Sequence, residues 1–322
     1  MTYSRIAGTG RYLPEKILTN FDLEKMVDTT DEWIRTRTGV ERRHCVAPDQ
    51  TTSDMCVEAA KLAMESAGVG PADIDMVIVG TTSPDLIFPN VGTLVQHRLG
   101  IPSCPAFSLE AACTGFIYAL TTADKFIKAD AAKRVLVIGA ECITKLIDWD
   151  DRNTCVLFGD GAGAVILEPS DEPGIMACHL GADGQYKELL YYPFGASKDL
   201  AKAGTDEAAI RMSGKDVFKV AVHTLGDVAS KTLDAAGIDK SELDWLVPHQ
   251  ANLRIIQATA KRLDLPMEKV IVTVQDHGNT SAASVPLALD VGVRDGRIQR
   301  GQLVLMEAFG GGFTWGSVLM RF

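Results

Sequence analysis

One cysteine of this sequence has neighbours that suit a nucleophile. Cys113 lies in the stretch EAACTGFIYAL, after a predicted strand and directly before an amphipathic helical pattern. At a helix N-terminus the dipole and the unpaired backbone N–H groups favour an anion, so we expect a lowered thiol pKa. The small residues Ala111, Ala112 and Gly115 leave room for a substrate. The alternative is a buried structural cysteine, which is our interpretation of the other thiols in the chain.

A cysteine nucleophile needs partners, and two downstream motifs contain candidates. His249 follows a predicted strand, at the end where α/β sheets place ligands. Asn279, in QDHGNTSAASVP, can present a fixed N–H donor beside Gly278. His277 is a rival imidazole, and each residue also fits a structural role, as a buried histidine or a helix-capping asparagine. The glycines of EAFGGGFTWG could offer backbone N–H groups to an oxyanion or form a plain turn.

These candidates must be positioned by the strands and helices around them. Apolar residues recur at helical spacing over 114–128, and a second helical pattern covers 53–67. Strands are predicted at MVIVG, PAFSLE, RVLVIGAE and GAVILE. Helices between near-continuous apolar strands indicate mostly parallel sheets covered on both faces, and therefore an α/β fold. The segment 171–215 has weaker periodicity, and we interpret it as loops and an insertion.

The chain also resembles itself. Residues 67–78, AGVGPADIDMVI, align with residues 236–247, AGIDKSELDWLV. Two further apolar strands recur in the same order, VLVIGAE with QLVLMEA and AGAVIL with WGSVLM. Each copy of the first pair predicts a helix closed by glycine, a short turn and a buried strand. We therefore expect two duplicated α/β halves, at 1–170 and 171–322.

Composition excludes several classes of protein. The net charge of −10 disfavours general nucleic-acid binding, which requires a broadly basic surface. Scattered cysteines without a CxxC pair argue against a disulfide framework and a zinc site. Neither a long apolar run nor a secretory signal is visible, so we expect a cytoplasmic protein that does not enter membranes.

Seven motifs together resemble the β-ketoacyl-acyl carrier protein synthase III family: GTGRYLPE, DTTDEWIRTRTG, ACTG, FGDGAGA, HQAN, HGNTSAAS and GGGFTWG. The resemblance covers essentially the whole chain. It implies a thiolase-like fold, with two duplicated halves in a five-layered αβαβα arrangement, and a homodimer. It also implies a Cys113, His249 and Asn279 triad, with His277 as a supporting neighbour. Thr114 replaces the alanine that usually follows the family's cysteine, a small change for the chemistry.

The implied reaction is a decarboxylative Claisen condensation that starts type II fatty-acid synthesis. An acyl group passes from coenzyme A to Cys113, and malonyl-acyl carrier protein then decarboxylates and attacks the acyl-cysteine. His249 Nε2 and Asn279 would donate to the enolate oxygen. The backbone N–H groups of Cys113 and Gly311 would form the oxyanion hole. The product would be a 3-oxoacyl-acyl carrier protein, and the resemblance implies no metal or other cofactor.

The same resemblance implies residues that bind coenzyme A. Trp33 would stack on the adenine, while Arg37 and Arg152 would contact the adenine or the phosphates. An aromatic side chain flanked by arginines suits a planar base that carries anionic groups. Asn252 would guide the pantetheine arm.

Carrier-protein and acyl-chain contacts are implied as well. The helical pattern 253–263 has one apolar side and one basic side, and the basic side carries Arg254, Lys261 and Arg262. It is an ordinary solvated face or a docking site for the acidic carrier protein. Phe88 would reach across the dimer to close the partner's acyl pocket, and Phe158 would line the same pocket.

Three alternatives remain. The order of Cys113, His249 and Asn279 also occurs in papain-like cysteine hydrolases, although their CGSCW-type context is absent. A non-catalytic acyl-binding protein on the same fold is a second alternative, since fold does not fix function. A related condensing enzyme of specialised metabolism, with another primer or with malonyl-coenzyme A, is the third. The depth of the acyl pocket decides which primer is accepted. Each methylene group contributes roughly 1–3 kcal/mol to the discrimination between acyl chains.

Overall fold

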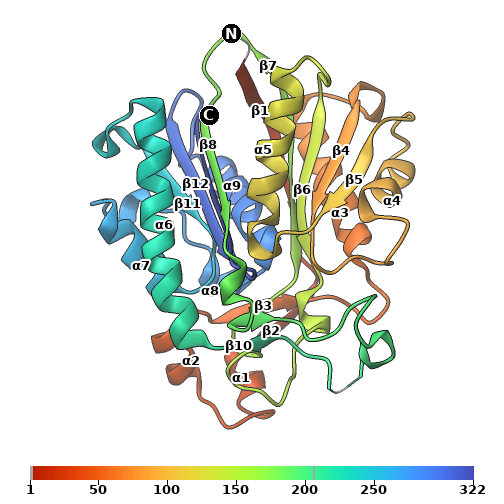
Figure 1. Cartoon of the computed structure of the whole chain (residues 1–322), viewed down its shortest axis with the longest axis vertical. Coiled ribbons are helices and arrows are strands. Elements are labelled where there is room, and N and C mark those ends of the chain that lie inside the picture. The colour runs from red at the N-terminus through yellow and green to blue at the C-terminus, as the bar shows by residue number, and fades with distance from the viewer. Residues whose placement is uncertain (1–2, 206) are drawn as a thin grey trace.

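The computed structural model describes residues 3–205 and 207–322, which form five layers (Figure 1). Two sheets enclose the central helices α5 (Gly115–Lys128) and α9 (Ser284–Arg294). Helices α3 (Thr52–Ala67) and α4 (Val91–Arg98) cover the outer face of the first sheet. Helices α6 (Gly214–Ala236) and α7 (Leu253–Arg262) cover the outer face of the second. The expected thiolase-like αβαβα arrangement is confirmed.

The two sheets share a strand order. The first sheet is ordered β1 (Tyr3–Tyr12), β7 (Gly161–Ser170), β6 (Val135–Glu141), β4 (Met76–Gly80) and β5 (Ala106–Leu109). The second is ordered β8 (Ile175–Ala182), β13 (Thr314–Arg321), β12 (Leu303–Gly310) and β11 (Trp245–Pro248). In both, a parallel set is extended by two strands that each pair antiparallel to their neighbour. On this basis we propose the duplicated halves 1–170 and 171–322, divided between β7 and β8.

Glycine closes the outer helix of each half at the same point. Helix α3 ends at Gly68 with φ 68°, and α6 ends at Gly237 with φ 67°. Both residues lie in the left-handed region, where glycine carries no Cβ penalty. Each chain then makes a short turn into a buried strand, β4 or β11. The helix, turn and strand predicted from both copies of the repeat are therefore confirmed.

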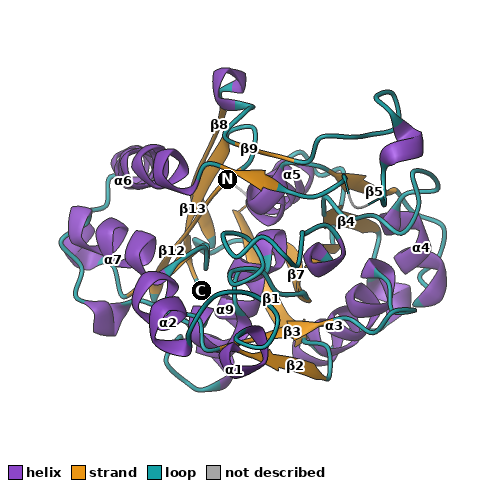
Figure 2. Cartoon of the chain, turned by 90° about the horizontal axis from the view of Figure 1, so that it is seen from below, coloured by secondary structure: helices purple, strands orange, loops and turns teal. Residues whose placement is uncertain are grey.

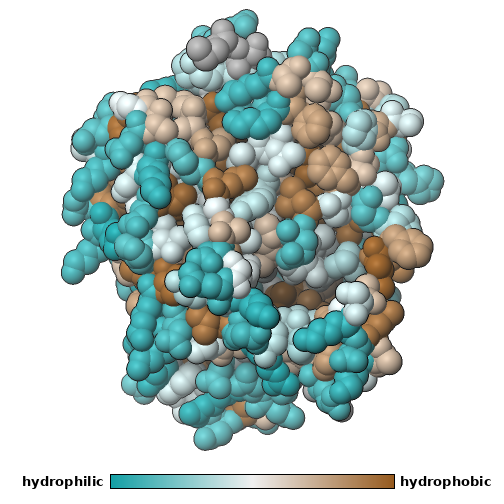
Figure 3. All heavy atoms as spheres, viewed as in Figure 1, coloured by the Kyte–Doolittle hydropathy of each residue, from teal (hydrophilic) through white to brown (hydrophobic). Residues whose placement is uncertain are grey.

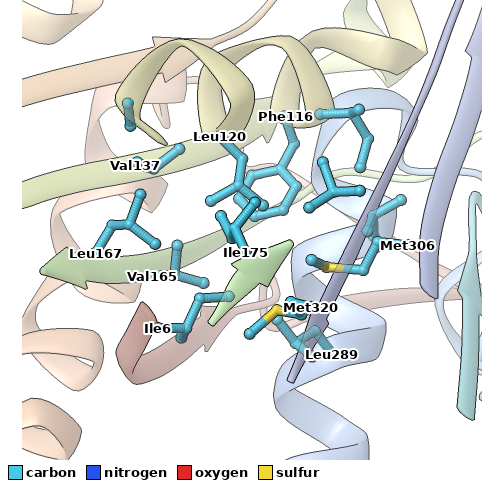
Figure 4. Close-up of a cluster of buried hydrophobic side chains, with 14 of the residues drawn as sticks. Ile6, Phe116, Leu120, Val137, Val165, Leu167, Ile175, Leu289, Met306 and Met320 are labelled. Carbon is cyan, nitrogen blue, oxygen red and sulfur yellow. The ribbon is translucent and has the colours of Figure 1, made fainter. Parts of the chain in front are cut away.

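The central helices pack between the sheets through apolar side chains (Figure 4). Phe116 and Leu120 of α5 lie among Val137 and Val165 of the first sheet and Met306 of the second, and all are fully buried. Burial of each such side chain contributes about 1.5–3 kcal/mol. The helix predicted after Cys113 therefore fixes that residue relative to both sheets.

Smaller elements gather at one end of the layers, which Figure 2 views directly. They are β2 (Lys16–Thr19), α1 (Asn20–Leu23), α2 (Asp31–Thr38), β3 (Arg42–Cys45), β9 (Leu190–Tyr191), β10 (Arg211–Met212) and α8 (Val274–His277). The expectation of loops and an insertion over 171–215 is wrong in part, because this segment contains β8, a strand of the second sheet. Strand β8 is an edge strand that pairs only with β13 and is mostly half-buried, which explains its weak apolar periodicity.

Candidate active site

Cys113 sits in a tight turn between a strand and a central helix. The turn is the 3₁₀ helix η2 (Ala112–Thr114), which follows β5 and precedes α5. Ala112 has φ 46°, and its backbone N–H donates to Glu110 Oε1 at 2.9 Å. A Cβ on Gly310, at the end of β12, would lie 2.6 Å from Cys113 N. Only a glycine at 310 therefore lets the turn sit this close to β12.

Asn279 is held by both its backbone and its side chain. Its N–H donates to Leu157 O at 2.8 Å, and its carbonyl accepts from Gly159 N at 3.0 Å. The side-chain Oδ1 accepts the N–H of Ser281 at 2.9 Å. With Oδ1 engaged in this way, Nδ2 is the end of the amide that is left to donate to a substrate.

His249 continues β11 beyond Pro248 and is fixed at two points. Its N–H donates to Glu307 O at 2.8 Å, and its Nδ1 lies 2.5 Å from Ser284 Oγ. Ser284 is the first residue of α9. The imidazole is therefore oriented with Nε2 as the nitrogen that remains for chemistry.

A second 3₁₀ turn brings these residues together. It is η8 (Ser281–Ala283), which packs against the η2 turn and leads into α9. Ser281, the first residue of η8, has its hydroxyl near Cys113, where it lowers the pKa of the thiol. Cys113, His249 and Asn279 are 8%, 4% and 7% exposed, so only a thin group can reach them. The three predicted residues thus belong to one buried cluster, built from η2 on one side and β11 and η8 on the other.

The expected lowering of the thiol pKa is wrong in direction. Burial raises the pKa of Cys113 to about 12; the Ser281 hydroxyl opposes this, and the Glu141 carboxylate adds to it. Moreover, α5 begins at Gly115, two residues beyond the cysteine. A helix terminus contributes only about 0.3–1 kcal/mol, and its effect fades within one turn. Burial likewise lowers the pKa of His249 to about 3, so thiol and imidazole are both neutral at pH 7.

The residues predicted to bind coenzyme A also lie together. The Arg37 and Arg152 guanidinium carbons lie 4.9 Å and 5.3 Å from the centre of the Trp33 ring. Asn252 Nδ2 donates to Arg37 O at 3.1 Å, which joins the start of α7 to α2. Arg152 Nη1 also donates to Asp28 O at 2.8 Å. The structure thus places an aromatic ring and two cations at one end of the molecule.

The two predicted acyl-pocket residues lie in different surroundings. Phe158 is buried, and its backbone forms a bridge with Asn279. Phe88 is 83% exposed and follows two further exposed apolar residues, Leu86 and Ile87. In a single chain, Phe88 therefore lines no pocket.

The oxyanion-hole candidate Gly311 is near the cysteine turn. A Cβ on Gly311 would lie 3.6 Å from Ala112 Cβ and 3.0 Å from Leu190 O. Thr314 Oγ1 donates to Ala111 O at 2.9 Å, which holds the glycine-rich turn against the segment before η2. The glycine run therefore lies beside the turn that carries Cys113, and the oxyanion-hole role of Gly311 stays a prediction.

The predicted carrier-protein face is exposed along α7. Arg254 and Lys261 are exposed, in a region where hydrophilic side chains dominate the surface (Figure 3). Arg262 is also exposed, but its Nη2 lies 2.7 Å from Asp227 Oδ1 on α6. An acidic partner would compete with Asp227 for this guanidinium, so Arg262 is the least available of the three.

Several contacts of this site carried no signal in the sequence. Ser281, Ser284 and Glu141 are common residue types, and only the folded chain shows that Ser284 contacts His249 and that Ser281 contacts Glu141. Within residues 3–205 and 207–322, no group of three or more His, Cys, Asp or Glu side chains could hold a metal ion. Across the same residues, no helix combines the length and apolar character needed to cross a membrane.

Comparisons with known proteins extend over the whole chain. Residues 107–184 match the family model of 3-oxoacyl-[acyl-carrier-protein (ACP)] synthase III, and residues 233–322 match the model of its C-terminal part. The chain is 62% identical over 320 residues to beta-ketoacyl-[acyl-carrier-protein] synthase III of Xanthomonas campestris pv. campestris, covering 99% of this chain and 98% of that one. It is 60% identical to the protein of that name from Thioalkalivibrio sulfidiphilus, over 100% of both chains.

Solved structures agree with the sequence relatives. The 3-oxoacyl-[acyl-carrier-protein] synthase III of Aquifex aeolicus superposes with a TM-score of 0.93 at 48% identity, covering 99% of this chain and 100% of that one. The priming beta-ketosynthase of the R1128 polyketide pathway superposes with a TM-score of 0.94 at 39% identity, covering 99% and 96%. Because identity this high extends over nearly the full length of each relative, the chain belongs to the 3-oxoacyl-[acyl-carrier-protein] synthase III family.

Proposed function

We propose that this chain condenses an acyl-CoA primer with malonyl-acyl carrier protein, releases CO₂ and forms a 3-oxoacyl-acyl carrier protein, which starts type II fatty-acid synthesis. The acyl group is carried on Cys113 between the two half-reactions. The observation that supports this most directly is the packing of the η2 turn, which carries Cys113, against the η8 turn, which follows Asn279. His249 joins the cluster through Ser284 at the end of η8.

In the first half-reaction, the neutral thiol must lose its proton. Burial keeps His249 uncharged, so its imidazole accepts the Cys113 proton while sulfur bonds to the acyl carbon. The carbon–sulfur bond to coenzyme A then breaks, and the imidazole returns the proton to the departing thiolate. The Ser284 hydroxyl can accept from Nδ1–H or donate to Nδ1, so it supports either tautomer of His249.

In the second half-reaction, charge develops on the malonyl thioester oxygen. Loss of CO₂ leaves an enolate, and the N–H groups of His249 Nε2 and Asn279 Nδ2 stabilise its oxygen. The enolate carbon attacks the acyl-cysteine, and the Cys113 and Gly311 N–H groups stabilise the tetrahedral oxyanion. Collapse of this intermediate releases the Cys113 thiolate and the product.

In this proposal, coenzyme A and the acyl carrier protein are both negatively charged, and each binds to a surface that carries basic side chains. Trp33, Arg37, Arg152 and Asn252 bind coenzyme A at the α2 end of the molecule. The exposed basic side of α7 docks the acidic carrier protein through Arg254 and Lys261, with Arg262 shared with Asp227. A pantetheine arm is thin enough to reach side chains that are less than a tenth exposed.

The acyl pocket requires a second subunit in this proposal. Phe88 and its apolar neighbours are exposed in the single chain, and burial of such a segment against a partner is favourable. The enzyme is a homodimer in which each Phe88 closes the other subunit's pocket, beside Phe158. No metal or other cofactor takes part, and the reaction takes place in the cytoplasm, where the free thiols of the described residues stay reduced.

Mass spectrometry of the intact protein after incubation with a panel of acyl-CoA thioesters tests this function. We expect one acyl group on Cys113 for the preferred primer and none on the Cys113→Ala variant. Subsequent addition of malonyl-acyl carrier protein should remove the acyl group and yield a 3-oxoacyl product. Release of free fatty acid without condensation would instead establish the cysteine hydrolase. The panel also identifies the primer, because the acyl group found on Cys113 gives its chain length and branching.

A further inference from the structure

A buried carboxylate that the proposed mechanism does not use lies behind Cys113. Glu141 is the last residue of β6 and is fully buried. Its oxygens accept from Thr82 N at 3.1 Å and 3.2 Å and from Ser83 Oγ at 2.6 Å. The Thr82 hydroxyl and the Thr81 hydroxyl donate as well, at 3.1 Å and 3.3 Å. Glu141 thus binds the beginning of the loop that leads from β4 to Phe88.

The same carboxylate reaches the other side of the nucleophile. The Ser281 hydroxyl donates its one proton to Glu141 Oε1 at 3.2 Å, and it can turn this proton to the sulfur when Cys113 ionises, which lowers the pKa of the thiol. The Ser281 backbone N–H holds Asn279 Oδ1, and the residue has φ 50°. A non-glycine residue in this region is uncommon, and it persists only where the surroundings fix it. Glu141 provides one of these fixed contacts.

We propose that Glu141 is a positioning residue, which holds the Ser281 hydroxyl toward Cys113 and anchors the Phe88 loop on the same carboxylate. Its importance for turnover rests on the proposed function, in which Cys113 carries the acyl group and Phe88 closes a pocket. One side chain then links the nucleophile to the loop that shapes the acyl pocket. A buried carboxylate with this many donors is costly to replace, because each orphaned donor loses about 1–3 kcal/mol.

The charge of Glu141 also acts on the thiol. The titratable groups that face Glu141 are the thiols of Cys56 on α3, Cys142 after β6, and Cys113, each of whose pKa the carboxylate raises. Glu110 raises the pKa of Cys113 from the other side. The carboxylate and the Ser281 hydroxyl therefore act on the thiol in opposite directions.

Two variants test the proposal on the full chain, with readouts that do not require condensation. Alkylation of Cys113 by iodoacetamide at pH 8 should be about tenfold faster in Glu141→Gln. This factor corresponds to a fall of one unit in the pKa of the thiol. Alkylation should be slower in Ser281→Ala, which loses the favourable hydroxyl. If the substitutions merely loosened the site, alkylation of Cys113 would be faster in both variants. Changes of alkylation rate in opposite directions therefore distinguish a positioning role from a loss of stability. Hydrogen exchange, followed by mass spectrometry, should rise in peptides covering 81–90 of Glu141→Gln and stay unchanged over 110–116.

Asp124→Asn is the matched control, because Asp124 is equally buried and its carboxylate also accepts a serine hydroxyl, that of Ser4 at 2.7 Å, away from the site. It should leave alkylation and exchange over both peptides as in the wild type. The proposal is overturned if Glu141→Gln behaves like Asp124→Asn, or if Glu141→Gln and Ser281→Ala shift alkylation in the same direction. Should no acyl-CoA acylate Cys113, the proposed function fails, while these two readouts still decide the role of Glu141.

Discussion

At the scale of single residues, burial sets the chemistry of this site. Cys113 and His249 are both neutral because water is excluded, and an ion pair between them is not the resting state. Nucleophilicity then depends on a proton transfer that occurs only when a thioester is present. Asn279 has a different task, since its Oδ1 is bound to Ser281 and its Nδ2 is directed to substrate.

Asn279→Asp should separate the two half-reactions. The carboxylate can still accept from Ser281 N, but it replaces an N–H donor by a negative oxygen beside the developing enolate. We expect malonyl decarboxylation to fall by about 10²- to 10³-fold, the usual cost of one such donor. Acylation of Cys113 should persist. Release of CO₂ and acyl-enzyme mass measure the two steps, with exposed Gln299→Glu as the amide-to-carboxylate control. Loss of acylation with normal decarboxylation would reverse the assigned roles.

At the scale of elements, two similar turns meet at the site. The η2 turn begins with Ala112 at φ 46° and leads into α5, while η8 begins with Ser281 at φ 50° and leads into α9. The second position of η2 is Cys113, and that of η8 is Ala282. In the proposed duplication, the proposed nucleophile thus lies in only one of the two copies of this turn, and the other copy contacts Asn279 through Ser281 and leads to Ser284, which contacts His249.

Gly310→Ala tests how tightly the η2 turn is seated. The added Cβ would lie 2.6 Å from Cys113 N, closer than real Cβ atoms approach, and 3.0 Å from Cys113 Cβ, which is a tight contact. Urea unfolding should show a loss of about 1–3 kcal/mol, as in other overpacked sites. Acylation should slow about 10²-fold, because a displacement of 1 Å can have that effect. Gly184→Ala, where a Cβ meets open space, should change neither quantity. Wild-type acylation by Gly310→Ala would show that the turn adapts.

The sequence predicted helices and strands better than it predicted the surroundings of individual side chains. Helix α5 and the glycine-capped repeats follow from local periodicity and residue type, so the sequence predicts them, whereas it does not predict the separate 3₁₀ turn that holds Cys113. The direction of the Cys113 pKa shift was not predicted correctly, because it depends on burial by η8 and β12, which are remote in the chain. Strand β8 was missed because an edge strand needs little apolar alternation. The surroundings of Phe88 depend on a second chain.

At the scale of the whole molecule, buried titratable groups shape the response to pH. Burial raises the pKa of Glu307 to about 8 and of Glu141 to about 7, and lowers that of His277 to about 4. A glutamate in the unfolded chain loses its proton near the usual pKa of 4.5. In the folded state these two glutamates keep their protons to a higher pH. These glutamates therefore reduce stability as pH rises from about 4.5 to 8. The histidines reduce it as pH falls below about 6.5.

Glu307→Gln should remove one of these pH dependences. Glutamine fills a similar volume and has no proton to lose, so the variant should gain stability over the wild type as pH rises. Between pH 5 and pH 7.5 the difference in unfolding free energy should grow by about 2–3 kcal/mol, at about 1.4 kcal/mol per pH unit before relaxation. Urea titrations at both pH values measure it. Parallel pH profiles would mean that Glu307 is ionised in the folded state.

The pairing of β1 with β7 and of β8 with β13 has a consequence for synthesis. In each sheet, the strand made first has as its partner the strand made last. Strand β1 can pair only after β7 has left the ribosome, which completes the first sheet. Strand β8 must likewise wait until β13 emerges. At about 5–20 residues per second, the roughly 130 residues between β8 and β13 take about 7 to 26 seconds to synthesise. During this time the nascent chain displays an unpaired edge strand, which makes it a natural client for chaperones.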